Sequence, residues 1–201
     1  MEVIGLRVIT EAFAHAVEVV DARRPRAVSS RTGASYQPGI GPHPESQAVR
    51  LVTTEMAADQ TFIGQLDVPY PGGGRQRCDW CLGAPPEWSW AIEVKMLRLM
   101  GDNNKLNDNM LMHILSPYPA HRSALTDCAK LAASGLGRQR AVMIYAFEYP
   151  DWPVAPAVEA FELLAARLVA LGPRHAAPFQ HLIHPVHRHG YVFGWEVGGP
   201  R

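Results

Sequence analysis

Apolar and polar positions recur along the chain with two periods, and the changes between them divide it into elements. Apolar residues at helical spacing predict helices at 2–20, 44–59, 122–137 and 154–172. Short apolar segments bounded by Gly, Pro and polar residues predict strands at 61–69, 75–83, 88–97, 141–149 and 190–197. The Pro- and Gly-rich stretch 21–44 and the polar stretch 100–109 are predicted to be loops.

The order of these elements predicts the fold class. A helix, three successive strands, a helix and a further strand give an αβββαβ core over roughly 44–149. This order favours a mixed central sheet flanked by helices, in an α/β or α+β fold. We interpret residues 1–201 as a single domain, in which the helix at 2–20 and the segment 154–197 are additions to the core.

Composition narrows the class of protein. With 47% hydrophobic and 19% charged residues, the chain of 201 residues is expected to fold as a globular protein. Three cysteines give no disulfide framework, which favours a reducing, cytoplasmic setting. No apolar run approaches the length of about 20 residues that spans a bilayer, so no membrane partner is expected. A formal net charge of zero counts mildly against nucleic-acid binding, although the distribution of charge matters more.

The strand at 88–97 carries charges that a buried strand does not need. Residues two apart in a strand share a face, so Glu93 and Lys95 lie on the face of Ala91, and Ile92, Val94 and Met96 lie on the other. Burying an ion pair stabilises a fold little, so a purely structural role explains Glu93 and Lys95 poorly.

Asp79 brings a second carboxylate toward the same place. If 75–83 and 88–97 are antiparallel neighbours, Asp79 lies across from the region of Glu93. Two carboxylates beside a lysine can hold Mg²⁺ and position or deprotonate a water for phosphodiester hydrolysis. The lysine can also offset the negative charge that develops on the phosphate.

Asp79 followed by Glu93-x-Lys95 resembles the signature of the PD-(D/E)XK nucleases, a superfamily with the restriction-endonuclease-like fold. The resemblance covers roughly residues 44–149, with the Asp in the second strand of the trio and the E-x-K in the third. Cys78 stands where many members have Pro. The resemblance implies a metal-dependent DNA endonuclease of restriction or defence type, acting with Mg²⁺ or with Mn²⁺ in its place, and working as a homodimer.

The resemblance also implies roles for individual residues. Asp79, Glu93 and the carbonyl of Val94 would bind the metal, and Lys95 would activate the water. Members often supply another metal-site Glu from the first core helix, where Glu45 and Glu55 are the candidates. Glu45 shares a helical stripe with Val49, Val52 and Met56 and is therefore preferred, although a helix-dipole role explains it equally well.

Further polar residues are candidates for auxiliary or phosphate-binding roles. Asp127 and Lys130 lie on one stripe of the helix at 122–137, where a solvated face with an i,i+3 ion pair is the alternative. Arg122 precedes this helix at a position suited to a phosphate contact. The loop after the E-x-K strand could bring Asp102, Lys105 and Asp108 near the site.

Two other functions stay open at this point. One is a non-catalytic nucleic-acid-binding protein on the same fold. The other is a zinc- or partner-binding protein that uses Cys78, Cys81 and the C-terminal histidines, which are His181, His184, His187 and His189. A C-x₂-C pair within a strand is expected to point its sulfurs to opposite faces, which disfavours the zinc site.

Overall fold

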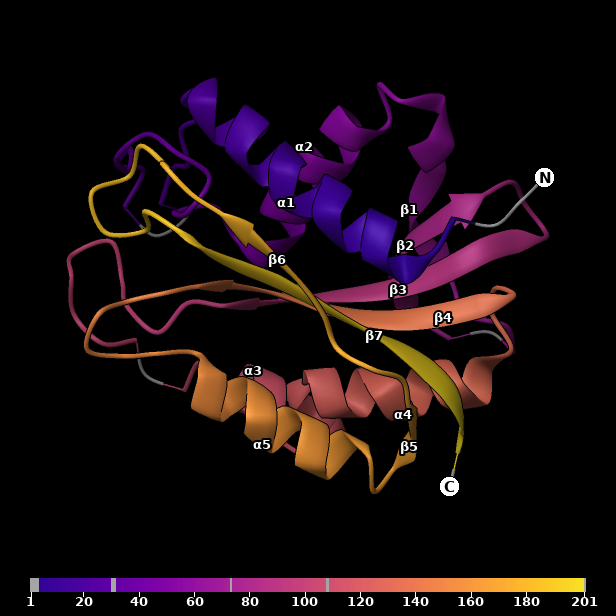
Figure 1. Cartoon of the computed structure of the whole chain (residues 1–201). Coiled ribbons are helices and arrows are strands. Elements are labelled where there is room, and N and C mark those ends of the chain that lie inside the picture. Colours follow the sequence, from indigo (N-terminus) through magenta and orange to yellow (C-terminus); the bar gives the residue numbers. More distant parts are fainter. Residues whose placement is uncertain (1–3, 30–31, 73, 108, 201) are drawn as a thin grey trace.

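A twisted central sheet with helices on both faces forms the molecule (Figure 1). The computed structural model describes residues 4–29, 32–72, 74–107 and 109–200. One face is covered by α1 (Leu6–Ala22) and α2 (Glu45–Met56). The other is covered by α3 (Met112–Leu115), α4 (Ala124–Ser134) and α5 (Ala155–Ala165). The sequence-based prediction of a mixed sheet flanked by helices is confirmed.

Within the described residues, seven strands build the sheet in the order β1-β2-β3-β4-β7-β5, and β6 also pairs with β7. Their bounds are β1 Gly64–Pro69, β2 Arg77–Gly83, β3 Trp88–Leu97, β4 Gln139–Phe147, β5 Val169–Leu171, β6 His175–Phe179 and β7 Gly190–Pro200. β1, β2 and β3 form an antiparallel meander, and α4 lies in the crossover that makes β4 parallel to β3. From α2 to β4 the order is the αβββαβ series expected from the sequence, with short helical turns added.

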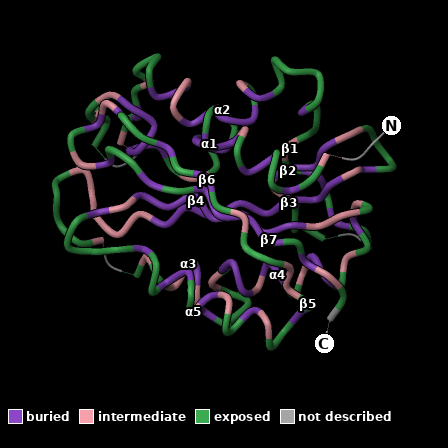
Figure 2. The backbone as a smooth tube through the Cα atoms, in the orientation of Figure 1, coloured by how far each residue is buried: buried purple, intermediate pink, exposed green. Residues whose placement is uncertain are grey.

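Alternation along β3 divides its side chains between two apolar cores. Ile92, Val94 and Met96 belong to the core that includes the buried faces of α1 and α2. Ala91 belongs to the core that includes α4 and α5. The residues of the central strands β3 and β4 are buried nearly throughout, whereas the edge strand β1 is mostly exposed (Figure 2). The two faces predicted for this strand are therefore confirmed, and Glu93 and Lys95 lie on the face of Ala91, toward α4.

Some predicted boundaries were wrong. The helix predicted at 154–172 ends at Ala165, and the apolar residues that follow form the short strand β5 on β7. An apolar run of this kind fits both helix and strand, and pairing with β7 decides between them. The strand predicted at 61–69 begins with the 3₁₀ turn η1 (Gln60–Phe62). α3, β6 and a second 3₁₀ turn, η2 (Pro119–His121), were not predicted.

Candidate active site

The candidate site lies where β2 and β3 separate. Their register pairs Trp80 with Ile92, so the next residue of β2, Asp79, stands opposite Glu93. Beyond this pair, side chains replace the strand partner of β3. The N–H of Val94 donates to Asp79 Oδ2 at 2.8 Å, and the N–H of Met96 donates to Glu45 Oε2 at 2.6 Å. Two carboxylates thus hold the open edge of β3 on either side of Lys95.

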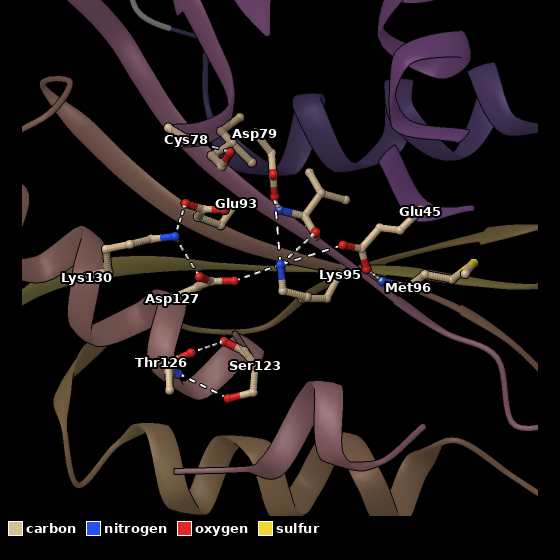
Figure 3. Close-up of polar contacts among 12 residues, drawn as sticks. Glu45, Cys78, Asp79, Glu93, Lys95, Met96, Ser123, Thr126, Asp127 and Lys130 are labelled. Atoms are coloured by element: carbon tan, nitrogen blue, oxygen red, sulfur yellow. Dashed lines mark hydrogen bonds and ion pairs between the residues drawn. The ribbon is translucent and has the colours of Figure 1, made fainter. Parts of the chain in front are cut away.

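Lys95 is the centre of this group (Figure 3). Its Nζ lies 2.8 Å from Asp127 Oδ2, 3.6 Å from Glu45 Oε1 and 3.9 Å from Asp79 Oδ2. The same Nζ lies 3.4 Å from the carbonyl oxygen of Val94. Three acidic side chains from β2, α2 and α4 therefore meet at one buried ammonium.

A second lysine bridges the remaining carboxylates. Lys130 Nζ lies 2.6 Å from Glu93 Oε1 and 2.8 Å from Asp127 Oδ1. The hydroxyl of Tyr70 donates to the same Glu93 oxygen at 2.5 Å, and the Lys130 ammonium lies 4.9 Å from the centre of the Tyr70 ring. We call the six charged residues the lysine–carboxylate cluster: Glu45, Asp79, Glu93, Lys95, Asp127 and Lys130.

The start of α4 fixes the position of Asp127. Ser123 is the N-cap of this helix, and its hydroxyl accepts the N–H of Thr126 at 3.3 Å. The Ser123 hydroxyl also donates to the carbonyl of Ser116, which ties the helix start to the preceding loop. Asp127 follows in the first turn, where a carboxylate is favoured by the helix dipole. Lys130, one turn later, lies on the same face.

The lysine–carboxylate cluster has more negative than positive charge. Four carboxylates face two ammonium groups, so two negative charges are in excess when all six residues are ionised. Burial and the neighbouring Asp127 and Asp79 raise the pKa of Glu93 well above its usual range. Burial also raises the pKa of Glu45. Both shifts have burial as their main cause, and for Glu45 the neighbouring Lys95 acts in the opposite direction.

The carboxylates have the opposite effect on the lysines. Burial alone would lower the pKa of Lys95, but Glu45, Asp127 and Asp79 raise it above its ordinary value. Glu93 and Asp127 likewise raise the pKa of Lys130 against the effect of burial. Both lysines are therefore held in the charged form.

Solvent reaches the lysine–carboxylate cluster at Asp79 and Glu45. Glu93 is 1% exposed, whereas the side chains of Asp79 and Glu45 are 34% and 33% exposed. These two carboxylates line a small cavity of about 50 Å³ together with residues of α2 and β1. A ligand can therefore approach from the side of Asp79 and Glu45.

The structure brings together most of the residues that the sequence proposed for the site. Asp79, Glu93, Lys95, Asp127 and Lys130 lie together with Glu45. Glu55, the alternative to Glu45, instead forms an ion pair with Arg23 at 2.5 Å. Sequence reasoning missed Tyr70, because no local pattern connects this turn residue with Glu93.

Other proposed residues lie outside the lysine–carboxylate cluster. Arg122 is exposed and has a left-handed backbone, with φ of 47°. Lys105 is exposed, and no ion pair or hydrogen bond joins its side chain to the described residues of this cluster. Asp108 lies outside the described residues. Asp102 is described, but it contacts two histidines, so the prediction that its loop reaches the site is wrong for this residue.

The two cysteines do not behave as predicted. Cys78 and Cys81 both belong to the core beneath α4 and α5, so the expectation that their sulfurs point to opposite faces is wrong. β2 departs from strict alternation around Asp79, and Cys78 Sγ donates to the carbonyl of Ile92 at 3.4 Å. Among the described residues, the group with metal-ligand spacing contains neither cysteine, so the structure does not assemble the proposed zinc site.

That group consists of Asp102, His184 and His187, whose ligand atoms lie within 4.8 Å of one another. His187 Nε2 lies 3.0 Å and His184 Nε2 lies 3.7 Å from Asp102 Oδ1. The hydroxyl of Tyr149 lies 2.8 Å from His187 Nδ1. We call these four residues the histidine cluster. It joins the loop after β3 to the loop between β6 and β7.

Hydrogen bonds assign the protons in the histidine cluster. His184 Nδ1 accepts two backbone N–H groups, from Val186 and His187, each at 3.2 Å. A neutral His184 therefore carries its proton on Nε2, which faces Asp102. Burial lowers the pKa of His184 to about 4 and also lowers that of His187, so both rings are neutral at pH 7.

The same assignment disfavours a metal ion at this place. Metal binding requires a free Nε2 lone pair, which the backbone bonds to Nδ1 deny to His184. The two rings are also stacked, with their centroids 4.6 Å apart and their planes within 14° of parallel. We interpret the histidine cluster as a hydrogen-bonded link between two loops.

A cavity larger than the one at Asp79 and Glu45 borders the histidine cluster at Tyr149 but lies apart from the lysine–carboxylate cluster. Its volume is about 850 Å³, and its lining includes Trp152 from the segment after β4, Arg188 from the loop between β6 and β7, and Tyr191 from the start of β7. It contains no residue of the lysine–carboxylate cluster. Size alone therefore does not identify the site in this molecule.

Comparisons with family models, with curated proteins and with solved structures found no significant match. In the described part of the chain, no helix is both long and apolar enough to cross a membrane.

Proposed function

We propose that this chain is a metal-dependent nuclease of the PD-(D/E)XK type that hydrolyses phosphodiester bonds in DNA. The observation that carries the proposal is the meeting of Asp79, Glu93 and Lys95 at the point where β2 and β3 separate. The αβββαβ element order supports it. Structural ion pairs seldom gather an uncompensated excess of carboxylates in a half-buried place, whereas functional sites often do.

The residues present fit a magnesium ion. Mg²⁺ prefers hard oxygen ligands, and Asp79, Glu93 and the carbonyl of Val94 would supply them, with Glu45 as a further carboxylate. When all six residues are ionised, the two excess negative charges of the lysine–carboxylate cluster equal the charge of one divalent ion. Mg²⁺, or Mn²⁺ in its place, supplies electrostatic stabilisation of the phosphate and lowers the pKa of the attacking water.

Lys95 would act as a cation in this reaction. Its acidic neighbours raise its pKa, so its Nζ keeps its proton at neutral pH. A protonated amine orients the attacking water and offsets the charge that develops on the phosphate. Of the roles considered from the sequence, these two are therefore favoured over proton abstraction by Lys95.

Asp79 and Glu45 would position the strand as well as bind the ion. Their bonds to the N–H groups of Val94 and Met96 fix the backbone on both sides of Lys95. This arrangement holds the Val94 carbonyl near Lys95 Nζ. Substitution of Asp79 or Glu45 would therefore remove a metal ligand and also shift the backbone that carries Lys95.

The proposed nuclease activity also suggests an oligomeric state and a biological role. A cut through both strands of a duplex needs two sites, so we infer that the enzyme acts as a homodimer. A restriction or defence role in the cytoplasm is the setting that the resemblance favours. Light scattering with and without a DNA duplex measures the number of chains in the complex.

A cleavage assay tests the proposal. Supercoiled plasmid and single-stranded DNA are incubated with Mg²⁺, with Mn²⁺ and with EDTA. We expect cleavage only with a divalent ion, and a loss of about 10²-fold or more in Lys95→Ala and Asp79→Ala. Arg7→Ala is the control, because it removes only an exposed ion pair on α1.

Equal cleavage by the wild type and both site variants would refute the catalytic assignment. Metal-independent binding of DNA without cleavage would favour the alternative, a non-catalytic nucleic-acid-binding protein. Circular dichroism of each variant separates loss of catalysis from loss of fold.

A further inference from the structure

Lys130 lies on α4, but its ammonium group points toward the carboxylates of the cluster. Its ammonium lies between Glu93 Oε1, at 2.6 Å, and Asp127 Oδ1, at 2.8 Å. Each distance corresponds to a close charged contact. The ammonium therefore occupies the gap between two carboxylates that would otherwise repel each other.

The surroundings of this gap are those of a cation site. The Tyr70 ring lies beneath the ammonium, with its centre 4.9 Å from Nζ, and aromatic faces attract cations. The Tyr70 hydroxyl donates to the Glu93 oxygen that Lys130 contacts, which fixes that oxygen in place. Carboxylate oxygens held in this way are ligands for a divalent ion.

The side chain of Lys130 is less tightly enclosed in the cluster than that of Lys95. The Lys95 side chain is 9% exposed and is contacted by carboxylates from β2, α2 and α4. The Lys130 side chain is 21% exposed and contacts only Glu93 and Asp127 within the cluster. Its long flexible stem can carry the ammonium toward solvent.

We propose that Lys130 is an internal counter-ion that occupies a divalent-cation position between Glu93 and Asp127, and that the ion binds by displacing its ammonium. This inference rests on the proposed function, since it concerns the same metal site. It adds Asp127 to the ligands of the ion and makes Lys130 a competitor for them. Once displaced, the ammonium is free to contact a phosphate of the nucleic acid.

Isothermal titration of the full chain with Mn²⁺ tests the competition. Removing the competing charge in Lys130→Met should lower the Kd for Mn²⁺ by about tenfold or more. Lys130→Arg keeps the charge and should bind Mn²⁺ like the wild type. Arg138→Met is the matched control, because it removes a cation from an exposed pair with Glu87.

A second measurement needs no variant and covers the case in which Lys130→Met does not fold. Lysines of the wild-type protein are labelled with an amine-reactive reagent and quantified by mass spectrometry. Saturating Mn²⁺ should increase the labelling of Lys130 severalfold, while Lys95 stays protected and the exposed Lys105 reacts equally in both conditions.

The outcomes separate this inference from the proposed function. An unchanged or weaker Mn²⁺ affinity in folded Lys130→Met, or Lys130 that stays protected with Mn²⁺ bound, overturns the inference and leaves the metal site standing. Absence of Mn²⁺ binding in both the wild type and Lys130→Met overturns both proposals.

Discussion

The lysine–carboxylate cluster and the histidine cluster are both buried polar groups, but their charges are balanced differently. In the histidine cluster, one carboxylate faces two neutral rings that turn N–H groups toward it. In the lysine–carboxylate cluster, four carboxylates share two ammonium groups. The first group has one charged residue among neutral partners, whereas the second has more carboxylates than ammonium groups and is where we propose a divalent cation.

The pKa shifts of Asp102 and Glu93, one acid from each group, have opposite signs. Although burial opposes the shift, the hydrogen bond from His187 and the charge of Arg98 lower the pKa of Asp102. The pKa of Glu93 is instead raised, chiefly by burial. Ionisation of Asp102 therefore stabilises the fold, whereas ionisation of Glu93 destabilises it. This contrast distinguishes a structural link from a candidate ligand site, and it can be broken or sharpened by substitution.

The largest effect is expected from Lys95→Met. It leaves four carboxylates with one ammonium, and removing one partner of a buried ion pair costs about 3–5 kcal/mol. We expect the free energy of unfolding in urea to fall by this amount in metal-free protein. Added Mn²⁺ should restore part of the loss. An unchanged unfolding midpoint would contradict the prediction that Lys95 compensates the surrounding carboxylates.

A smaller loss is expected from Asp102→Asn in the histidine cluster. The amide keeps the shape and one acceptor oxygen but removes the negative charge that His187 Nε2 faces, and a hydrogen bond to a neutral acceptor is weaker than one to a carboxylate, at a cost of about 1–2 kcal/mol. Urea unfolding measures the change. Unlike the loss in Lys95→Met, this one should not respond to Mn²⁺, and recovery on adding Mn²⁺ would indicate a metal site at these histidines.

The sequence predicts one of these groups far better than the other. Strand periodicity placed Glu93 and Lys95 on one face, and a short turn brought Asp79 across from them. Asp102 and His184 come from loops far apart in the sequence, whose packing no local pattern encodes. Nothing in the spacing of the histidines therefore indicated their partner.

The helical stripe of α4 shows a second limit. Asp127 and Lys130 form the i,i+3 pair that the pattern predicts, with 2.8 Å between charged atoms. The same pattern fits a solvated helix face, which was the alternative. Asp127 is instead 3% exposed, because it pairs with Lys95 and Lys130 pairs with Glu93, both on β3. These contacts depend on the crossover between β3 and β4. Tertiary packing supplies this information, and local periodicity does not.

Acid should weaken the histidine cluster. The pKa of His184 is about 4 in the fold and near 6.5 when unfolded, so the unfolded chain binds the proton more readily between these values. Stability should thus fall as the pH drops from about 6.5 to 4, by roughly 3 kcal/mol. The measurement is the free energy of unfolding against pH. His184→Asn, whose amide oxygen can accept the same backbone N–H groups, should show a shallower slope, and an equal slope would contradict the assignment.

The smallest and most informative change is Glu93→Gln. The raised pKa of Glu93 means that the fold favours its uncharged form, which Gln resembles. We expect metal-free Glu93→Gln to unfold at the same or a higher urea concentration, with a gain of at most about 1 kcal/mol, while Mn²⁺ binding and DNA cleavage are lost. Asp102→Asn makes the same chemical change with the opposite expected sign. If Glu93→Gln instead destabilises the fold as strongly as Asp102→Asn, the carboxylate of Glu93 is a structural partner of Lys130, and the excess charge cannot be evidence for a cation site.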